Sequence, residues 1–181
     1  MFRIKAKPAP ITPAEELEIR RMVLDFGDQD SLAYFATRRD KSAVFSADRK
    51  AAVLYGAVGN VFVASGDPVG DPSSWPHAIE AWHALCRSVG ARPVVLACSQ
   101  ESARLYRGIG LSIVAIGDEA IINTADFNVS SPALANIRKT IRRMNREGIT
   151  AKVARARDLP TDLLAQLENC RNAWRHDQVE R

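Results

Sequence analysis

Three short β-type runs lie close together in the first half of this 181-residue chain. They are SAVFS (42–46), AAVLYGAV (51–58) and NVFVAS (60–65), and the turn residues Asp48-Arg-Lys50 and Gly59-Asn60 lie where one run gives way to the next. Such short connections cannot carry a crossover, so consecutive strands must run antiparallel. The chain is therefore predicted to build its central sheet from an antiparallel meander.

Helical patterns flank this meander. Thr12 and Pro13 are suited to the N-cap and first position of a helix that runs to about Asp25. An amphipathic helix is expected from residue 75 to a terminal Gly90, and a short one, capped by Ser99, over 100–110. Further β-type runs are RPVVLACS (92–99), LSIVAIG (111–117) and EAIINTADF (119–127). The order α-β-β-β-α-β-α-β-β predicts an α/β fold with a mixed, mostly antiparallel central sheet flanked by helices.

Composition and segment lengths set the domain organisation. With 46% hydrophobic and 25% charged residues, the chain has ordinary globular composition. We expect a leader (1–10), one lobe (11–130), and a tail (131–181) with a basic helix, a strand (149–156) and a helix that runs to the last residue. The apolar stripe of that last helix is left unclosed, which predicts an incomplete second lobe. No apolar run has the roughly 18 residues that span a bilayer, and no signal peptide is evident, so a cytoplasmic location is expected.

Metal and redox chemistry find no support in the sequence. Cys86, Cys98 and Cys170 form no C-x-x-C pair, and the three histidines form no H-x-x-x-H pair. We expect buried thiols, no metal and no cofactor.

Positive charge is concentrated near the C-terminal end. Residues 1–130 hold 14 Lys or Arg against 15 Asp or Glu, whereas 131–181 hold 11 against 6. In SPALANIRKTIRRMNREG (131–148), helical spacing places five cations opposite an apolar arc. They are Arg138, Lys139, Arg142, Arg143 and Arg146. This face is either merely solvated or a phosphate-binding surface for RNA or anionic lipid head groups.

The stretch SGDPVGDPSSWP (65–76) connects the third β-type run to the following helix. It allows a catalytic loop, a phosphate cradle or a rigid corner. Because Pro68 and Pro72 fix φ and lack backbone donors, a rigid corner is favoured, with Asp67 bonding the backbone. Trp75, Trp82 and Trp174 are expected to be core or interface aromatics.

Several of these segments resemble bacterial phosphatidylglycerol lysyltransferases, in the cytosolic domain with an acetyltransferase-like (GNAT) fold. The matching pieces are SLAYFATRRDKSAVFS, VASGDPVGDPSSWP, ARPVVLACSQESARLYRGIGL, GDEAIINTADF and NIRKTIRRMNREG. The family-marking turn is Gly66, Asp67, Pro68 and Gly70, and no [QR]-x-x-G-x-[GA] loop for coenzyme A is present between 58 and 80. Tyr106 lies where coenzyme A-using relatives of the fold often carry a catalytic tyrosine, but without that loop we do not assign it this role.

The resemblance implies transfer of an amino acid, lysine first, from aminoacyl-tRNA to a phosphatidylglycerol-type lipid. The implied partners are aminoacyl-tRNA and anionic phospholipid, together with an upstream membrane region and a second lobe, and the implied place is the inner face of the membrane. No catalytic residue is carried over, and a chain without the second lobe is expected to be inactive. The alternatives are a coenzyme A-dependent N-acyltransferase and a non-catalytic module that binds RNA or anionic lipid.

Overall fold

The computed structural model describes residues 8–27, 30 and 32–179. Its contacts divide the chain into two units, Met1–Asp118 and Glu119–Arg181, which are described separately. Of the predicted leader, only residues 8–10 lie within the described range, and residues 180–181 of the last predicted helix lie outside it.

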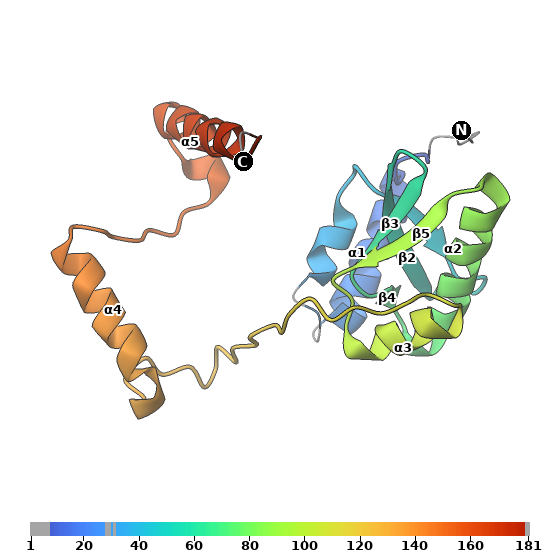
Figure 1. Cartoon of the computed structure of the whole chain (residues 1–181), viewed down its shortest axis with the longest axis horizontal. Coiled ribbons are helices and arrows are strands. Elements are labelled where there is room, and N and C mark those ends of the chain that lie inside the picture. Colours follow the sequence, from blue (N-terminus) through green and yellow to red (C-terminus); the bar gives the residue numbers. More distant parts are fainter. Residues whose placement is uncertain (1–7, 28–29, 31, 180–181) are drawn as a thin grey trace. The chain divides into compact units, whose positions relative to one another are not determined.

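The first unit contains a five-stranded sheet. The strands are β1 (Ser42–Phe45), β2 (Ala51–Val58), β3 (Val61–Ser65), β4 (Val69–Gly70) and β5 (Arg92–Leu96). Their order is β1-β2-β3-β5, and β4 pairs with β2 (Figure 1). The pairs β1–β2, β2–β3 and β2–β4 are antiparallel, whereas β3–β5 is parallel. The predicted meander and the mixed, mostly antiparallel sheet are confirmed.

Local sequence signals begin and end the helices of this unit. In α1 (Pro13–Phe26), Thr12 and Glu15 form a reciprocal capping box, and Pro13 occupies the first turn. The helix α2 (Trp75–Val89) ends at Gly90, whose φ of 72° is accessible to glycine at little cost. A third helix, α3 (Gln100–Gly108), begins at Ser99, whose side chain accepts a hydrogen bond from the backbone of Ser102. A 3₁₀ turn, η2 (Ala33–Thr37), follows α1.

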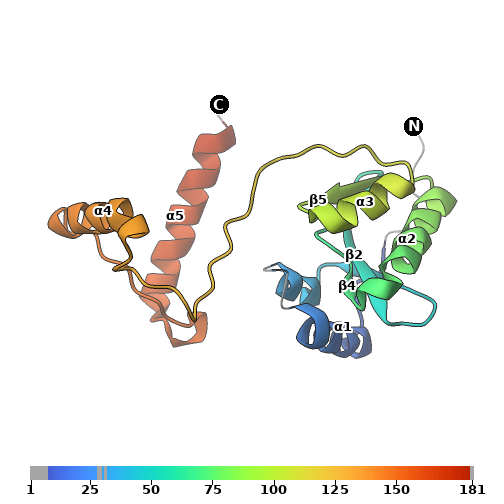
Figure 2. The same cartoon turned by 90° about the horizontal axis from the view of Figure 1, so that it is seen from below.

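Two apolar layers enclose the sheet. On one face, alternate β2 residues such as Val53 pack with Phe62, with Trp82 of α2 and with Tyr106 of α3. On the other face, Leu54 packs with Ile19 of α1 and with Val69 of β4. The helices α2 and α3 thus cover one side and α1 the other, as Figure 2 shows. Because β2 contributes to both layers, five of its residues, 51–55, are buried.

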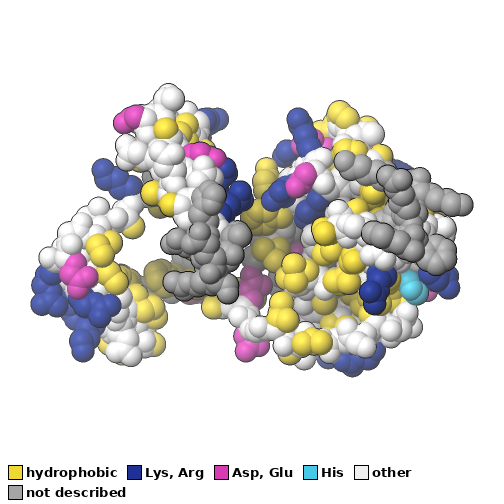
Figure 3. All heavy atoms as spheres, turned by 45° about the horizontal axis from the view of Figure 1, so that its top comes forward, with side chains coloured by type: hydrophobic (Ala, Val, Ile, Leu, Met, Phe, Trp, Pro, Cys, Tyr) yellow, Lys and Arg dark blue, Asp and Glu magenta, His cyan; other side chains and the backbone are white. Residues whose placement is uncertain are grey.

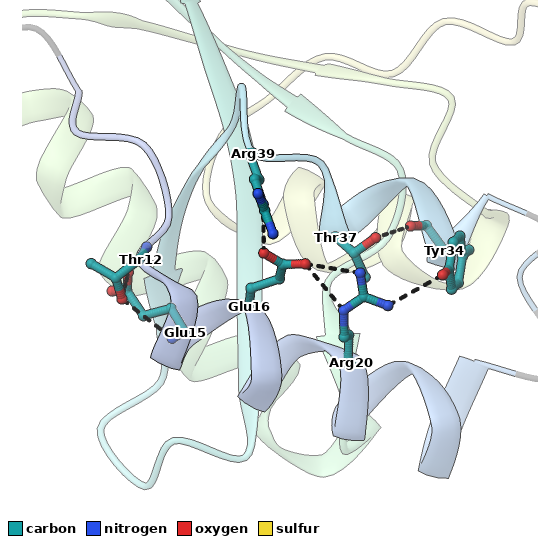
Figure 4. A network of polar contacts seen from close by, with 7 residues as sticks. All are labelled: Thr12, Glu15, Glu16, Arg20, Tyr34, Thr37 and Arg39. Atoms are coloured by element: carbon teal, nitrogen blue, oxygen red, sulfur yellow. Dashed lines mark hydrogen bonds and ion pairs between the residues drawn. The ribbon is translucent and has the colours of Figure 1, made fainter. Parts of the chain in front are cut away.

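A polar network joins α1 to the segment that follows it (Figure 4). Glu16, only 7% exposed, accepts hydrogen bonds from Arg20 Nη2 at 2.8 Å and Arg39 Nε at 2.9 Å. Arg20 also donates to the hydroxyl of Tyr34 at 3.2 Å. The bond from Arg20, followed by that from Arg39, holds the pKa of Glu16 below its usual value. The buried carboxylate is therefore paired on both sides.

The second unit consists of helices and irregular segments. Its elements are η4 (Pro132–Leu134), α4 (Ala135–Arg146), η5 (Ala156–Asp158) and α5 (Thr161–Val179). Among its residues whose exposure is described, none is buried. Cys170 is exposed and Cys98 is partly buried, which corrects the expectation of buried thiols, whereas Cys86 is buried as expected. Trp82 lies in the core, and Trp174, which was expected in a core or an interface, is exposed.

Three predicted strands are wrong. The runs 111–117, 119–127 and 149–156 contain no strand in the described structure. Apart from Leu111, which packs against the core, their large apolar residues are open to solvent; Ile116 is 73% and Ile121 83% exposed. A β-type composition gives a strand only where a neighbouring edge supplies hydrogen bonds and a packed face, and the described structure pairs none of these runs with one.

Candidate functional site

The turn 66–70 is tied to the beginning of α3 by one side chain. Asp67 Oδ1 accepts a hydrogen bond from the Ser99 backbone N–H at 2.7 Å and another from the Ser102 hydroxyl. Asp67 therefore bonds the backbone, as its position before a proline led us to expect. Its carboxylate sits where the amide groups of α3 carry partial positive charge, which is the favourable end for an anion.

The backbone of this turn has few donors left for a phosphate. The Gly66 N–H donates to Leu96 O at 2.8 Å and the Asp71 N–H to Lys50 O at 2.9 Å. Residues 69 and 70 pair with β2 as strand β4, which the sequence did not reveal. Pro68, Pro72 and Pro76 have no N–H at all. A pyrophosphate cradle of successive amides is therefore not available in this corner.

Gly70 allows the close approach that forms β4. Its φ is +97°, and a Cβ at this position would lie 2.1 Å from the Lys50 carbonyl oxygen. Trp75 Nε1 donates to the Gly70 carbonyl at 3.2 Å. No other residue type fits this position without moving β2.

A pocket of about 460 Å³ opens beside the turn, between α1, β4 and the start of α3. Its apolar wall includes Met22, Val23, Phe26, Pro68 and Trp75. Its polar and charged lining residues include Asp30, Asp67, Ser99, Glu101 and Arg104. The combination of an apolar wall and a few polar groups is typical of small-molecule sites. The sequence analysis did not single out Glu101 and Arg104, although a spacing of three residues predicts that both lie on one side of the short helix α3.

Tyr106 lies in the core and not in this pocket. It is 1% exposed, and its hydroxyl has no hydrogen-bond partner among the described residues. Burial raises the pKa of Tyr106 well above its usual value. In this structure it packs edge-on against Trp82, with ring centroids 6.2 Å apart, so its position here is that of a core aromatic.

The predicted basic face lies on α4, where Figure 3 shows a group of Lys and Arg side chains. Four residues of α4 line a shallow hollow of about 430 Å³: Lys139, Arg142, Asn145 and Arg146. At positions i, i+3, i+6 and i+7 these residues share one side of the helix. Asn145 adds an amide beside the three cations and was not singled out from the sequence.

The other two predicted cations have partners within the chain. Arg138 Nη1 donates to the carbonyl oxygens of Val129 at 2.8 Å and Ser131 at 2.5 Å. Arg143 forms a long ion pair of 4.0 Å with Glu147. The structure thus separates the five cations into three that line the hollow and two that contact other residues of the same unit.

Comparison with known proteins assigns the family. Residues 20–181 match the family model described as "Phosphatidylglycerol lysyltransferase, C-terminal". The chain belongs to this family.

Curated relatives of this lysyltransferase family are longer than the chain. It is 40% identical over 181 residues to the "Lysylphosphatidylglycerol biosynthesis bifunctional protein LysX" of Rhodococcus opacus, of which it covers 16%. It is 42% identical over 171 residues to the protein of the same name from Mycobacterium tuberculosis, of which it covers 15%. The chain thus spans about one-sixth of the length of these relatives.

Solved structures share the fold. The structure of L-PGS from Bacillus licheniformis superposes with a TM-score of 0.66 at 24% identity, over 91% of this chain and 51% of that one. The C-terminal domain (DUF2156) of a putative lysylphosphatidylglycerol synthetase from Agrobacterium fabrum gives 0.62 at 26% identity, over 75% and 42%. The fold of this lysyltransferase-family chain is therefore GNAT-like, as predicted. Within the part of the chain that the structure describes, no helix is both long and apolar enough to cross a membrane.

Proposed function

We propose that this chain takes part in the transfer of lysine from lysyl-tRNA to a hydroxyl of a phosphatidylglycerol-type lipid at the cytoplasmic face of the membrane. In this proposal the hollow on α4 holds phosphates of the tRNA. The observation that supports it most is the grouping of Lys139, Arg142 and Arg146 on one side of α4 in a member of the lysyltransferase family. The guanidinium group of arginine can donate two parallel hydrogen bonds to phosphate oxygens, and three cations on one helix face attract a polyanion.

The reaction makes modest demands on side chains. A lipid hydroxyl attacks the carbonyl carbon of the aminoacyl ester, a new ester C–O bond forms, and the C–O bond to the tRNA ribose breaks. The hydroxyl proton passes to the departing ribose oxygen, so no outside oxidant or cofactor is consumed. Because the donor ester is already activated, the main task is to hold two anionic substrates in the correct orientation. Cations that bind phosphate serve this task directly.

The coenzyme A alternative is less well supported. Such an enzyme would bind a pyrophosphate on the backbone amides between β3 and α2, and those amides are engaged or replaced by proline. Asp67 also places a carboxylate next to that corner. Both features oppose the binding of a pyrophosphate there.

A donor comparison tests the proposal. The protein is incubated with phosphatidylglycerol vesicles and either labelled lysyl-tRNA or labelled acetyl-coenzyme A, and the lipid and amine products are separated by mass spectrometry. Lysine on the lipid is the expected product. Acetyl transfer from coenzyme A without lysyl transfer would contradict the proposal. If tRNA and vesicles bind without any transfer, the chain acts as a binding module.

A further inference from the structure

The sheet of the first unit ends in a strand with one open side. Within the described residues β5 pairs only with β3, and the order β1-β2-β3-β5 places it at the edge of the sheet (Figure 1). The Arg92 N–H donates to Asn60 O at 2.8 Å. Leu96 O accepts from the Gly66 N–H, also at 2.8 Å. Because bonding directions alternate along a strand, Val95 directs its N–H and its C=O away from β3, towards the open side.

The residues on either side of Val95 limit what can pair with this edge. Pro93 has an outward-facing carbonyl oxygen but no N–H. The Ala97 N–H shares a planar peptide group with Leu96 O, which points to β3, so this N–H points outward. Ala97 itself has a left-handed φ of 60°, and its carbonyl oxygen lies near Gly66, 3.9 Å from the place of an added Cβ. The open side thus lacks a donor at Pro93 and an acceptor at Ala97.

One face of this edge strand is apolar and uncovered. Val95 packs against the layer formed with α2 and α3, so Val94 and Leu96 point to the opposite face of the sheet. They are 43% and 58% exposed there, and Val63 lies in register beside Val94. The only charged residue of β5 is Arg92. An edge strand with an exposed apolar face is a site where another strand can add to the sheet.

We propose that this edge binds a second copy of the chain, with the two β5 strands antiparallel across a two-fold axis at Val95. In this register each Val95 N–H donates to the Val95 C=O of the other copy. Pro93 faces Ala97 of the other copy, where its C=O accepts from the outward Ala97 N–H. The donor that Pro93 lacks falls opposite the carbonyl that Ala97 turns away. The strand is therefore complementary to itself, and this match favours a second copy over an unrelated strand.

The side chains also match in this register. Val94 lies opposite Leu96 of the other copy, and Leu96 lies opposite Val94, so four apolar side chains meet on one face. Such cross-strand pairs stabilise a sheet. Arg92 falls opposite Cys98 of the other copy, so like charges do not meet. Stable complexes bury roughly 1,200 Å² or more, and a five-residue edge buries less, so a weak, concentration-dependent dimer is expected.

Hydrogen exchange at one amide distinguishes the occupants of the edge. Exchange of the Val95 N–H is followed by NMR on the ¹⁵N-labelled chain at tens of micromolar and at millimolar concentration, and sedimentation equilibrium gives the molar mass. We expect protection of Val95, and a mass approaching that of a dimer, only at the higher concentration. Protection that does not change with concentration would assign the edge to an extended run of the same chain, such as 111–117, and overturn the proposal. A chain that stays monomeric, or a dimer in which Val95 exchanges freely, would also overturn it.

Two variants and one control locate the contact. Leu96→Lys places a charge in the apolar group and should weaken the dimer severalfold. Val95→Pro removes the two central N–H donors but no bond to β3, and it should weaken the dimer at least about tenfold. Val58→Lys adds the same charge on β2, at a valine that is 71% exposed and outside the contact, and it should leave the dissociation constant unchanged. Equal weakening by the two lysine variants would contradict the assignment.

The contact goes beyond the proposed function and does not depend on it. β5 belongs to the first unit, whereas the hollow on α4 belongs to the second. A failure of lysyl transfer therefore leaves the dimer proposal standing, and a monomeric chain leaves the proposed function standing. Circular dichroism shows whether Val95→Pro remains folded, and Leu96→Lys, at an exposed position, tests the same contact if it does not.

Discussion

Asp67 Oδ1 lies 2.7 Å from the backbone nitrogen of Ser99, although 32 residues separate them in the chain. This hydrogen bond fastens the corner between β3 and α2 to the beginning of α3. The Asp67 carboxylate therefore stabilises the fold and also lines the adjacent pocket.

Replacing Asp67 by Ala should loosen this corner. The variant loses the bonds to Ser99 and Ser102, and we expect a decrease of about 1–3 kcal/mol in the free energy of unfolding. Urea unfolding followed by circular dichroism measures it. Asp71→Ala is the control, because the Asp71 side chain bonds only locally, to the side chain and the backbone N–H of Ser73. This variant should cost less. Equal decreases for the two variants would contradict the role given to Asp67.

A pair of glycine variants separates steric clash from backbone strain. Gly70 and Gly110 have similar φ values of +97° and +92°, but only at Gly70 would a Cβ meet another atom, Lys50 O at 2.1 Å. Both alanine variants must adopt the left-handed backbone, which costs about 1–2 kcal/mol. Gly70→Ala should cost about 1–3 kcal/mol more, because β2 must move. Guanidinium unfolding of both proteins gives the difference, and similar midpoints would show that β4 does not approach Lys50 so closely.

Stability at acid pH should depend on Asp48. Hydrogen bonds from Ser46, then Ser74, then the Lys50 N–H lower the pKa of the Asp48 carboxyl from 3.8 to about 2. A depressed carboxyl pKa contributes stability that is fully present above the unfolded value and is lost as pH falls towards the folded value. The contribution should therefore disappear between about pH 4 and about pH 2.

Urea midpoints over this interval test the assignment. Asp48→Asn should lose less stability than the wild type as pH falls, and Ser74→Ala should lie between the two because it removes one donor of three. Parallel pH profiles for the wild type and Asp48→Asn would show that this network does not contribute.

Local signals were enough to predict the helices α1, α2 and α3 and the meander of β1, β2 and β3, but not β4. Thr12, Pro13, Gly90 and Ser99 mark helix ends through their own backbone and side-chain chemistry, so the sequence was sufficient. The runs 111–117 and 119–127 share the composition of β3, yet β3 is a strand because β2 and β5 lie beside it. Pairing partners of this kind are set by tertiary structure and cannot be read from a run alone.

The candidate site was predictable only in part. Five cations on one helix follow from spacing, but the bonds of Arg138 to two carbonyl oxygens depend on how the chain turns before α4. The pocket combines α1, β4 and α3, which no local pattern brings together. Likewise, the sequence SGDPVGDP contains no local signal that Val69 and Gly70 pair with β2.

The most direct test of the proposed role of α4 is the salt dependence of tRNA binding. Fluorescence anisotropy gives the affinity of the chain for labelled lysyl-tRNA at several salt concentrations. The variant Lys139→Gln/Arg142→Gln/Arg146→Gln alters only the hollow on α4. The control Lys152→Gln/Arg155→Gln/Arg157→Gln removes equal charge from exposed positions of the same unit.

The two variants should differ in the slope of log affinity against log salt. Every tRNA phosphate that the protein no longer neutralises makes this slope shallower by about 0.7–0.9, so the slope of the hollow variant should be shallower by roughly 2–3. The control should keep the wild-type slope within about 1. Equal slopes for the wild type and the hollow variant would contradict the assignment of this face as the tRNA-binding surface.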